Sequence, residues 1–183
     1  DGVKCQIDVA LPVLEDLKIK SFFFVYTSMF EEKPDYLEVF RYFRMNYFNS
    51  VDEFYINFYK VINNDLSEFF KKNEDVIKKI KIKFPFYTIE DIKFRLIRDK
   101  YLTHKEYEKN MILMMKEKNF ETKSHFSHLF FDKKDLNQLN SLGHLIGLHS
   151  HNHPTLLESL SYDEQKSEYE NCISVISKII DKP

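Results

Sequence analysis

The sequence predicts a mixed α/β protein in which two α/β segments flank a long helical stretch. The apolar run FFFVY at residues 22–26 predicts a strand over residues 21–27. A second run, LIGL at residues 145–148, predicts another strand and is bounded by Gly143 and Pro154. Between them, residues 29–131 carry helical periodicity almost throughout. Strands and helices that alternate in this way favour a parallel sheet.

The segment before the first predicted strand is expected to form a helix over residues 5–18, with Leu14 and Leu17 on its apolar face. Pro12 fits a helix only in its first turn, so we expect the regular part to begin near residue 10. The strand is continuously apolar, which predicts burial on both faces. The helix and strand complete a βαβ pattern if Asp1 ends a preceding strand.

The middle of the chain contains several helix-start signals. The expected helices are residues 34–48, one that begins after a capping box at residues 50–53, residues 66–80, one capped by Thr88, and one that begins after a capping box at residues 103–106. About a hundred residues are too many for a plain loop, so residues 29–131 are expected to form a helical subdomain. Their Phe- and Tyr-rich faces are expected to be core.

The C-terminal part is expected to contain a helix over residues 132–142, capped by Asp132 and ended by Gly143. The second strand follows. A last helix is expected after a capping box at residues 161–164, with inward-facing apolar residues at Tyr169, Ile173, Ile176, Ile179 and Ile180.

Histidines concentrate at the end of the second predicted strand. Four of the seven in the chain lie within residues 144–153. If the chain turns helically after the strand, His149 and His153 face the same way and can hold one divalent metal. The same facing argument points His151 elsewhere, as a partly exposed loop residue. Ser150 is expected to hydrogen-bond nearby backbone, and the spacing of the histidines alone is a weak signal.

Residues 143–154 (GHLIGLHSHNHP) resemble the second motif of the polysaccharide deacetylase family, in which a G-H-E-I-G strand leads into H-[ST]-x-x-H-P. Asp1-Gly2 resembles the end of the family's first motif, T-F-D-D-G. The segment of residues 11–25 is similar to the family's L-P-I-L-K-K-x-x-I-K-A-T-F-F-V. Positions after the histidines continue the family pattern; these are Leu156, Leu160, Ser161, Glu164 and Glu168.

This resemblance implies a partial, irregular (β/α) barrel formed by residues 1–28 and 132–183, with residues 29–131 as a helical insertion. It implies that Asp1, His149 and His153 are metal ligands, for zinc or else cobalt or nickel. The implied reaction is hydrolytic removal of acetyl groups from N- or O-acetylated sugars of a polysaccharide or oligosaccharide.

Three departures from the family pattern bear on activity. Leu145 stands where the family has Glu, a change expected to be tolerated beside the metal. The family's catalytic base would lie just before Asp1, and its general acid would lie after Pro183. We therefore assign no catalytic base or acid within residues 1–183, and we expect this chain alone to be weakly active or inactive.

Composition excludes few classes of protein. A net charge of −2 with 31% charged residues predicts no bulk attraction to nucleic acid. The lysines at positions 71, 72, 78, 79, 81 and 83 are expected to form a solvated helix face, with an anionic glycan or partner as the alternative. Cys5 and Cys172 are expected to be reduced core thiols.

The sequence contains no run of about 18 apolar residues, so no transmembrane segment is expected. The resemblance favours a bacterial protein of the cytoplasm, in glycan biosynthesis, with the cell envelope as the alternative compartment. It leaves the oligomeric state open.

Two other functions are compatible with the sequence. In the first, the chain is a degenerate deacetylase-like module that binds a partner through residues 29–131, with vestigial histidines. In the second, His149-Ser150-His151 is the H-x-H of an amidohydrolase-type barrel. That motif belongs on the first strand of such barrels, whereas here it follows about 148 residues.

Overall fold

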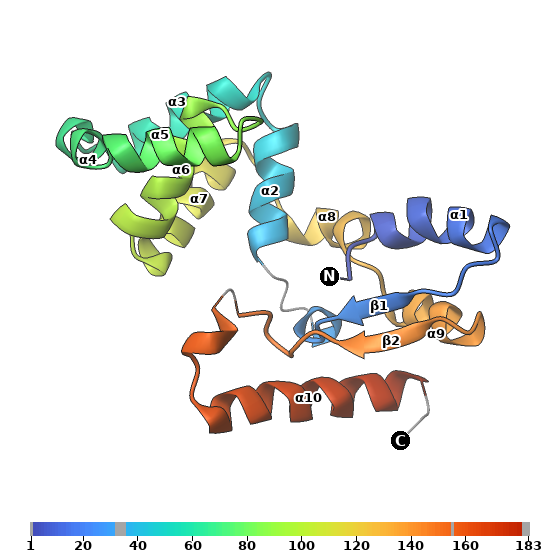
Figure 1. Ribbon diagram of the computed structural model, residues 1–183. Coiled ribbons are helices and arrows are strands. Elements are labelled where there is room, and N and C mark those ends of the chain that lie inside the picture. Colours follow the sequence, from blue (N-terminus) through green and yellow to red (C-terminus); the bar gives the residue numbers. More distant parts are fainter. Residues whose placement is uncertain (1, 32–35, 155, 181–183) are drawn as a thin grey trace. The chain divides into compact units, whose positions relative to one another are not determined.

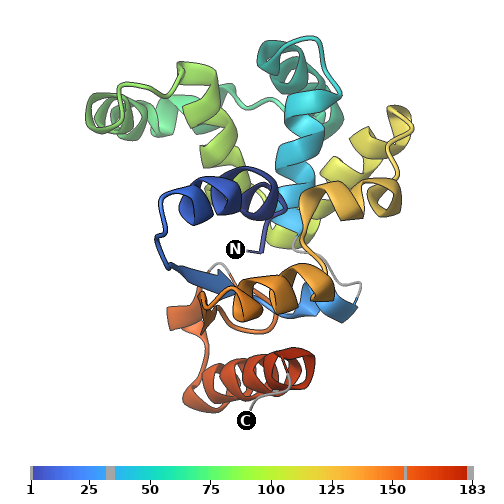
Figure 2. The same cartoon turned by 90° about the vertical axis from the view of Figure 1, so that its right-hand side faces the viewer.

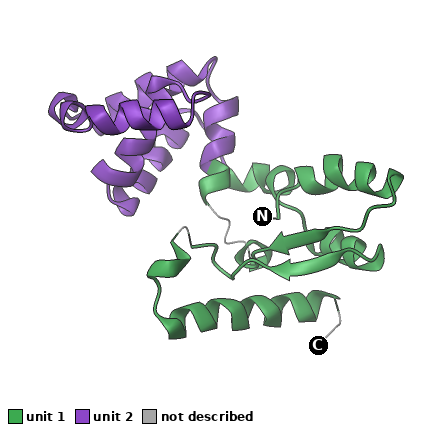
Figure 3. Ribbon diagram, in the orientation of Figure 1, with its two compact units in different colours: residues 1–39, 122–183 green, residues 40–121 purple. Residues whose placement is uncertain are grey.

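The computed structural model describes residues 2–31, 36–154 and 156–180 (Figure 1). The fold is mixed α/β, mostly helical, with two parallel strands. The chain divides into two compact units, residues 1–39 with 122–183 (unit 1) and residues 40–121 (unit 2) (Figure 3). Whether residues 29–131 are an insertion into a deacetylase domain is not tested by this division and stays a prediction.

Unit 1 is built around a two-stranded parallel sheet. Strand β1 (Phe22–Val25) pairs with β2 (Leu145–Leu148), so that Phe22 lies opposite Leu145 and Val25 opposite Leu148. Helices α1 (Leu11–Asp16) and α10 (Tyr162–Ile180) lie on opposite sides of the strand pair in both views (Figures 1 and 2). Helix α9 (Lys133–Ser141) packs against both β2 and α10. Within the described residues these strands do not close into a barrel.

Burial alternates along β1. Phe23 and Val25 are buried, whereas Phe22 is 64% exposed and Phe24 is 51% exposed. On the paired strand, Leu145 is 54% exposed. The prediction that this strand is buried on both faces is therefore wrong for the described structure, because the side chains of one face of β1 are more than half exposed.

The other elements of unit 1 largely match the sequence prediction. A π-helical turn (Gln6–Ala10) precedes α1, whose first turn contains Pro12 as expected. Helix α9 begins after a complete capping box formed by Asp132 and Asp135. The remaining elements are a 3-10 turn at Ser28–Glu31, helix α8 (Thr122–Leu129) and a 3-10 turn at Leu157–Ser159.

Two predictions about buried side chains in unit 1 are confirmed only for Ile176 and Cys172. On α10 the buried residues are Cys172 and Ile176, whereas Tyr169 is 40% exposed and Ile173 is 48% exposed. The inward face of this helix is thus rotated from the predicted one. Both cysteines are free as expected, but Cys5 is exposed and only Cys172 is a core thiol.

All regular elements in the described residues of unit 2 are helices. Its elements are α2 (Tyr36–Asn46, from Phe40 onward), α3 (Val51–Ile62), α4 (Ser67–Lys72), α5 (Glu74–Lys83), α6 (Ile89–Leu96), a π-helical turn (Ile97–Tyr101) and α7 (His104–Glu117). None of the described helices is long and apolar enough to cross a membrane.

Helix boundaries in unit 2 follow the predicted caps, with one exception. The side chains of Ser50, Thr88 and Thr103 each accept a hydrogen bond from the backbone N–H three residues later. The helix predicted over residues 66–80 is instead two helices that meet at Asn73. The Asn73 amide donates to the backbone oxygen of Phe69, and such local bonds compete with a continuous helix.

The core of unit 2 is aromatic, as predicted. Phe54 and Phe58 are fully buried, and the ring of Phe94 meets them edge to face at centroid distances of 5.4 and 5.0 Å. The Tyr107 ring packs on Phe58 at 6.2 Å, and burial raises the pKa of its phenol to about 12. These rings therefore stabilise the unit by packing and do not form an open ligand platform.

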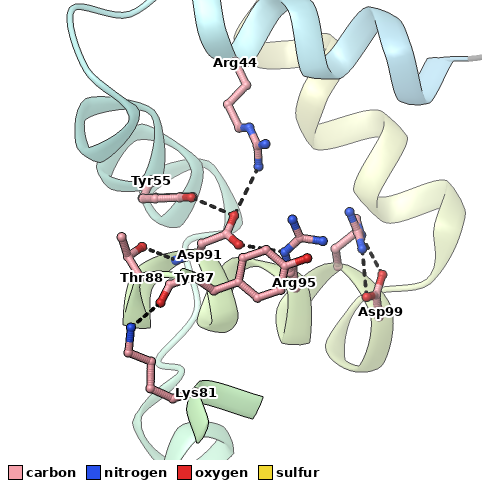
Figure 4. Close-up of polar contacts among 9 residues, drawn as sticks. Arg44, Tyr55, Lys81, Tyr87, Thr88, Asp91, Arg95 and Asp99 are labelled. Carbon is pink, nitrogen blue, oxygen red and sulfur yellow. Dashed lines mark hydrogen bonds and ion pairs between the residues drawn. The ribbon is translucent and has the colours of Figure 1, made fainter. Parts of the chain in front are cut away.

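A polar cluster centred on Asp91 adjoins this core (Figure 4). The Asp91 carboxylate accepts from Tyr55 Oη at 3.0 Å and from Arg95 Nε at 2.7 Å, and it lies 3.6 Å from Arg44 Nη1. Its side chain is 13% exposed. Burial and the negative charge of Asp91 raise the pKa of the Tyr55 phenol, so this group stays protonated and donates. One carboxylate thus joins α2, α3 and α6.

We predict that Asp91→Ala lowers the free energy of unfolding by about 3 kcal/mol, because it leaves part-buried donors without their charged acceptor. Urea denaturation measures this change. The matched control is Glu74→Ala, which removes a carboxylate from an exposed pair with Lys78 and should cost less than about 1 kcal/mol. Equal losses for the two variants would show that the Asp91 cluster is not a stability determinant.

Candidate metal centre at the strand ends

The histidines predicted to form a site lie in a loop that is held against the end of the sheet. The His149 backbone N–H donates to the Val25 carbonyl at 3.1 Å, which extends the strand pairing by one residue. A helical turn was predicted here, but the loop is not helical, because Ser150 and His153 have left-handed φ values of 64° and 56°. Ser150 is 5% exposed, and its hydroxyl accepts from the His153 N–H at 3.1 Å, as expected for a turn-shaping serine.

The loop brings His149 and His153 together despite the absence of a helical turn. Their Nε2 atoms lie 3.2 Å apart, and their ring centroids are 4.7 Å apart. Two imidazole nitrogens bound tetrahedrally to one zinc ion at about 2.05 Å would be about 3.3 Å apart. The two residues therefore fit a shared divalent metal in donor type and in separation.

The electrostatic state of His149 also suits a ligand. Burial, and next the neighbouring His153, lower the pKa of the His149 imidazole. A lowered pKa favours the neutral ring at pH 7, and the neutral ring carries the lone pair that a metal requires.

Tyr26 orients the second imidazole. Its ring is fully buried and stacks on the His153 ring, with centroids 5.1 Å apart and an interplanar angle of 15°. Tyr26 directly follows β1, so the first strand fixes a side chain of the loop that follows the second strand. From the sequence, Tyr26 was predicted only to belong to an apolar strand, with no role in the site.

Glu168 is the main anchor of the loop. The sequence analysis included it in the family pattern but predicted no role for it. One carboxylate oxygen accepts from the backbone N–H groups of His151 and Asn152 at 2.8 and 2.7 Å, and the other accepts from the Asn152 amide at 2.7 Å. Glu168 lies on α10, six residues into the helix. A single carboxylate on α10 thus holds the loop between the two candidate ligands.

His151 points away from the candidate pair, as predicted. Its Nδ1 lies 2.8 Å from Thr27 Oγ1, and its carbonyl accepts from the N–H groups of Thr27 and Ser28. The side chain is 12% exposed, so it is more buried than predicted. His151 therefore links the loop to the end of β1.

Asp1, the third predicted ligand, lies outside the described residues. Gly2 is described: it lies against the side chain of Met29, and its carbonyl accepts from the Phe131 N–H at 3.1 Å. Met29 follows Ser28, which contacts the histidine loop. Within the described part of the chain, no group of three or more His, Cys, Asp or Glu side chains is arranged to hold a metal.

The remaining histidine of the motif has a structural position. His144 is 3% exposed, and it lies at the opposite end of β2 from His149. Its Nδ1 accepts from the Ser21 N–H at 3.2 Å, and its Nε2 is 3.1 Å from a Glu15 oxygen. His144 thus connects the starts of both strands to α1. Outside the motif, His104 is exposed and pairs with Glu108.

Paired imidazoles at the carboxyl end of parallel strands are typical of a hydrolase that uses a metal. Comparison with protein families identifies the family: residues 52–183 match the polysaccharide deacetylase model, and the chain belongs to this family. The match covers the histidine motif and extends through most of unit 2. Neither curated proteins nor solved structures gave a significant match. Members of this family deacetylate sugars, as hydrolases acting on carbon–nitrogen bonds.

We predict that Glu168→Ala releases the histidine loop without unfolding the chain. The backbone amides of His151 and Asn152 lose a charged acceptor, which is worth roughly 1.5–3 kcal/mol per hydrogen bond, so their hydrogen exchange should accelerate about tenfold or more. Exchange measured by NMR tests this prediction.

The control for this experiment is Glu170→Ala on the same helix, which removes a carboxylate paired with the exposed Lys166. It should leave the loop amides unchanged. Loop amides that stay equally protected in both variants would exclude an anchoring role for Glu168.

Proposed function

We propose that this protein is a metal-dependent deacetylase that acts on N- or O-acetylated sugars. The observation that carries the proposal is the 3.2 Å approach of the His149 and His153 Nε2 atoms at the end of a parallel strand pair. Family membership supports the reaction class. The partial (β/α) barrel implied by the resemblance belongs to the same proposal.

In this proposal His149 and His153 hold the metal, and Asp1 completes the ligand set. The position of Gly2 beside Met29, at the same end of β1 as the histidine loop, supports the assignment of its neighbour. A bound zinc, cobalt or nickel ion would supply Lewis-acid activation of the acetyl carbonyl.

The other residues of the site keep the two ligands in place. Tyr26 stacks on the His153 ring, Ser150 holds the His153 backbone, and Glu168 holds the loop from α10. Such supporting contacts preorganise a metal site, because the free protein already has the ligands at binding distance. We assign no general base or general acid among the described residues.

The alternative is a non-catalytic module that binds a partner through its helical part. Exposed apolar side chains in unit 2 favour it: Ile82 is 81% exposed and Phe86 is 74% exposed, near the lysines of α5. In that case the histidines would be vestigial. Metal binding at the histidine pair distinguishes the two functions.

We predict that the purified chain binds about one zinc, cobalt or nickel ion, and that His149→Ala/His153→Ala abolishes binding, because two imidazole ligands are lost. Elemental analysis after dialysis against each metal measures this stoichiometry. The matched control is His104→Ala/His128→Ala, which removes two histidines from outside the site. An unmetallated wild-type chain after reconstitution, or equal metal content in all three proteins, would contradict the assigned site.

Acetate release from N-acetylated chitotetraose tests the reaction itself. We expect weak release or none, because no general base or acid is assigned within residues 1–183; any release should require the metal, stop in EDTA and be absent from His149→Ala/His153→Ala. Release that persists in that variant would assign the activity to another site. Rapid metal-dependent release would contradict the expected weak activity and would show that residues 1–183 supply the base and the acid.

A further inference from the structure

Unit 1 contains a cavity of about 500 Å³ that the proposed metal site does not use. It lies between the turn that follows β1 and the helices α8 and α9. The lining residues are Met29, Phe30, Lys123, Phe126, Ser127, Phe130, Phe131, Asp132, Lys133 and Lys134. Its volume is within the range of small-molecule sites.

The floor of this cavity is apolar and aromatic. Met29, Phe130 and Phe131 are each 2% exposed. The Phe126 ring packs against Phe130 with centroids 5.1 Å apart, and the Phe30 ring lies 6.4 Å from Phe131. The buried rings thus support Phe30 and Phe126, which are half-buried and present apolar surface to the cavity.

The rim carries uncompensated positive charge. Lys123, Lys133 and Lys134 are exposed, and within the described residues none of their ammonium groups pairs with a carboxylate. Most other lysine-rich segments contain such pairs, for example Lys72 with Glu68 and Lys78 with Glu74.

The one carboxylate in the lining is already occupied. Asp132 Oδ1 accepts from the backbone N–H groups of Lys134 and Asp135 at 2.7 and 3.0 Å, which caps α9. The nearby Asp135 carboxylate pairs with Lys4 at 2.8 Å. Asp132 keeps its negative charge, so the three lysines and one carboxylate of the lining give a net charge of +2 (3 − 1), and the cavity attracts anions.

One buried ring separates the cavity lining from the histidine pair. The Tyr26 ring stacks on His153 and meets the Phe130 ring edge to face, with centroids 6.1 Å apart. Phe130 is part of the cavity lining, and Tyr26 is fully buried. The cavity therefore lies close enough to the histidines to be considered as a neighbouring subsite of the proposed site.

We propose that this cavity binds an anionic sugar unit, one that carries a carboxylate or a phosphate, next to the acetylated unit of the substrate. The half-buried rings of Phe30 and Phe126 pack on the ring of the sugar, and the lysine ammonium groups form charge-assisted hydrogen bonds to its anionic group. The proposal rests on the proposed deacetylase function for the identity of the substrate, but binding to the cavity requires no metal.

The test is an NMR titration of the whole chain in EDTA with three sugars: N-acetylglucosamine, glucuronic acid and N-acetylglucosamine 6-phosphate. We expect at least one anionic sugar to bind about tenfold more tightly than N-acetylglucosamine, and shifts at the amides of α8 and α9. The two anionic sugars distinguish a carboxylate from a phosphate as the bound group. Equal affinities for all three sugars, or no binding of any, would refute the proposal.

Lys133→Gln/Lys134→Gln should abolish the preference for anionic sugars. This variant should fold, because positive charge in the first turn of a helix is not stabilising. The matched control, Lys71→Gln/Lys79→Gln, removes two exposed lysines in unit 2 and should retain the preference. A preference that survives in Lys133→Gln/Lys134→Gln would place the anion elsewhere.

Two further measurements separate this proposal from related ones. His149→Ala/His153→Ala should lose metal and keep the anionic preference, so that failure of the metal site and failure of the cavity are distinguishable. Decanoate should bind no more tightly than glucuronic acid. Tighter binding of decanoate would identify the cavity as a site for apolar acids and overturn the assignment to a sugar.

Discussion

The parallel pairing of β1 with β2 is the interaction on which the rest of unit 1 depends. It sets Val25 opposite Leu148, so both strands end at the same level and the residues that follow them meet. Tyr26, Thr27 and Ser28 then contact the histidine loop through stacking and hydrogen bonds. A shift of register by one residue would turn these contacts to the other face of the sheet.

Local signals in the sequence predicted much of the fold. The second strand has the predicted bounds, and the caps at Thr88, Thr103 and Asp132 form as expected because each depends on residues within one helical turn. It was harder to predict which face of a strand or helix is buried and where a helix is interrupted. The exposure of Phe22 and the rotated face of α10 depend on which elements surround them, and apolar periodicity does not contain that information.

The candidate site shows the same division between local and distant information. The motif predicted His149 and His153, and the serine between them acts on the backbone as expected. The predicted helical turn was wrong, because residues with left-handed φ values bring the two rings together. The roles of Glu168 and Tyr26 needed the tertiary structure, since each lies more than ten residues from the loop that it supports. Asp1 lies outside the described residues, so its assignment stays a prediction.

The order of the strands along the chain has a consequence for biosynthesis. About 120 residues separate β1 from β2, and unit 2 lies within that interval. During translation β1 leaves the ribosome well before its only described partner, so its apolar side chains stay unpaired while the helices are made. Folding of unit 2 would shorten the effective loop and lower the entropic cost of closing it. The candidate metal site can thus assemble only after all of unit 2 has been synthesised.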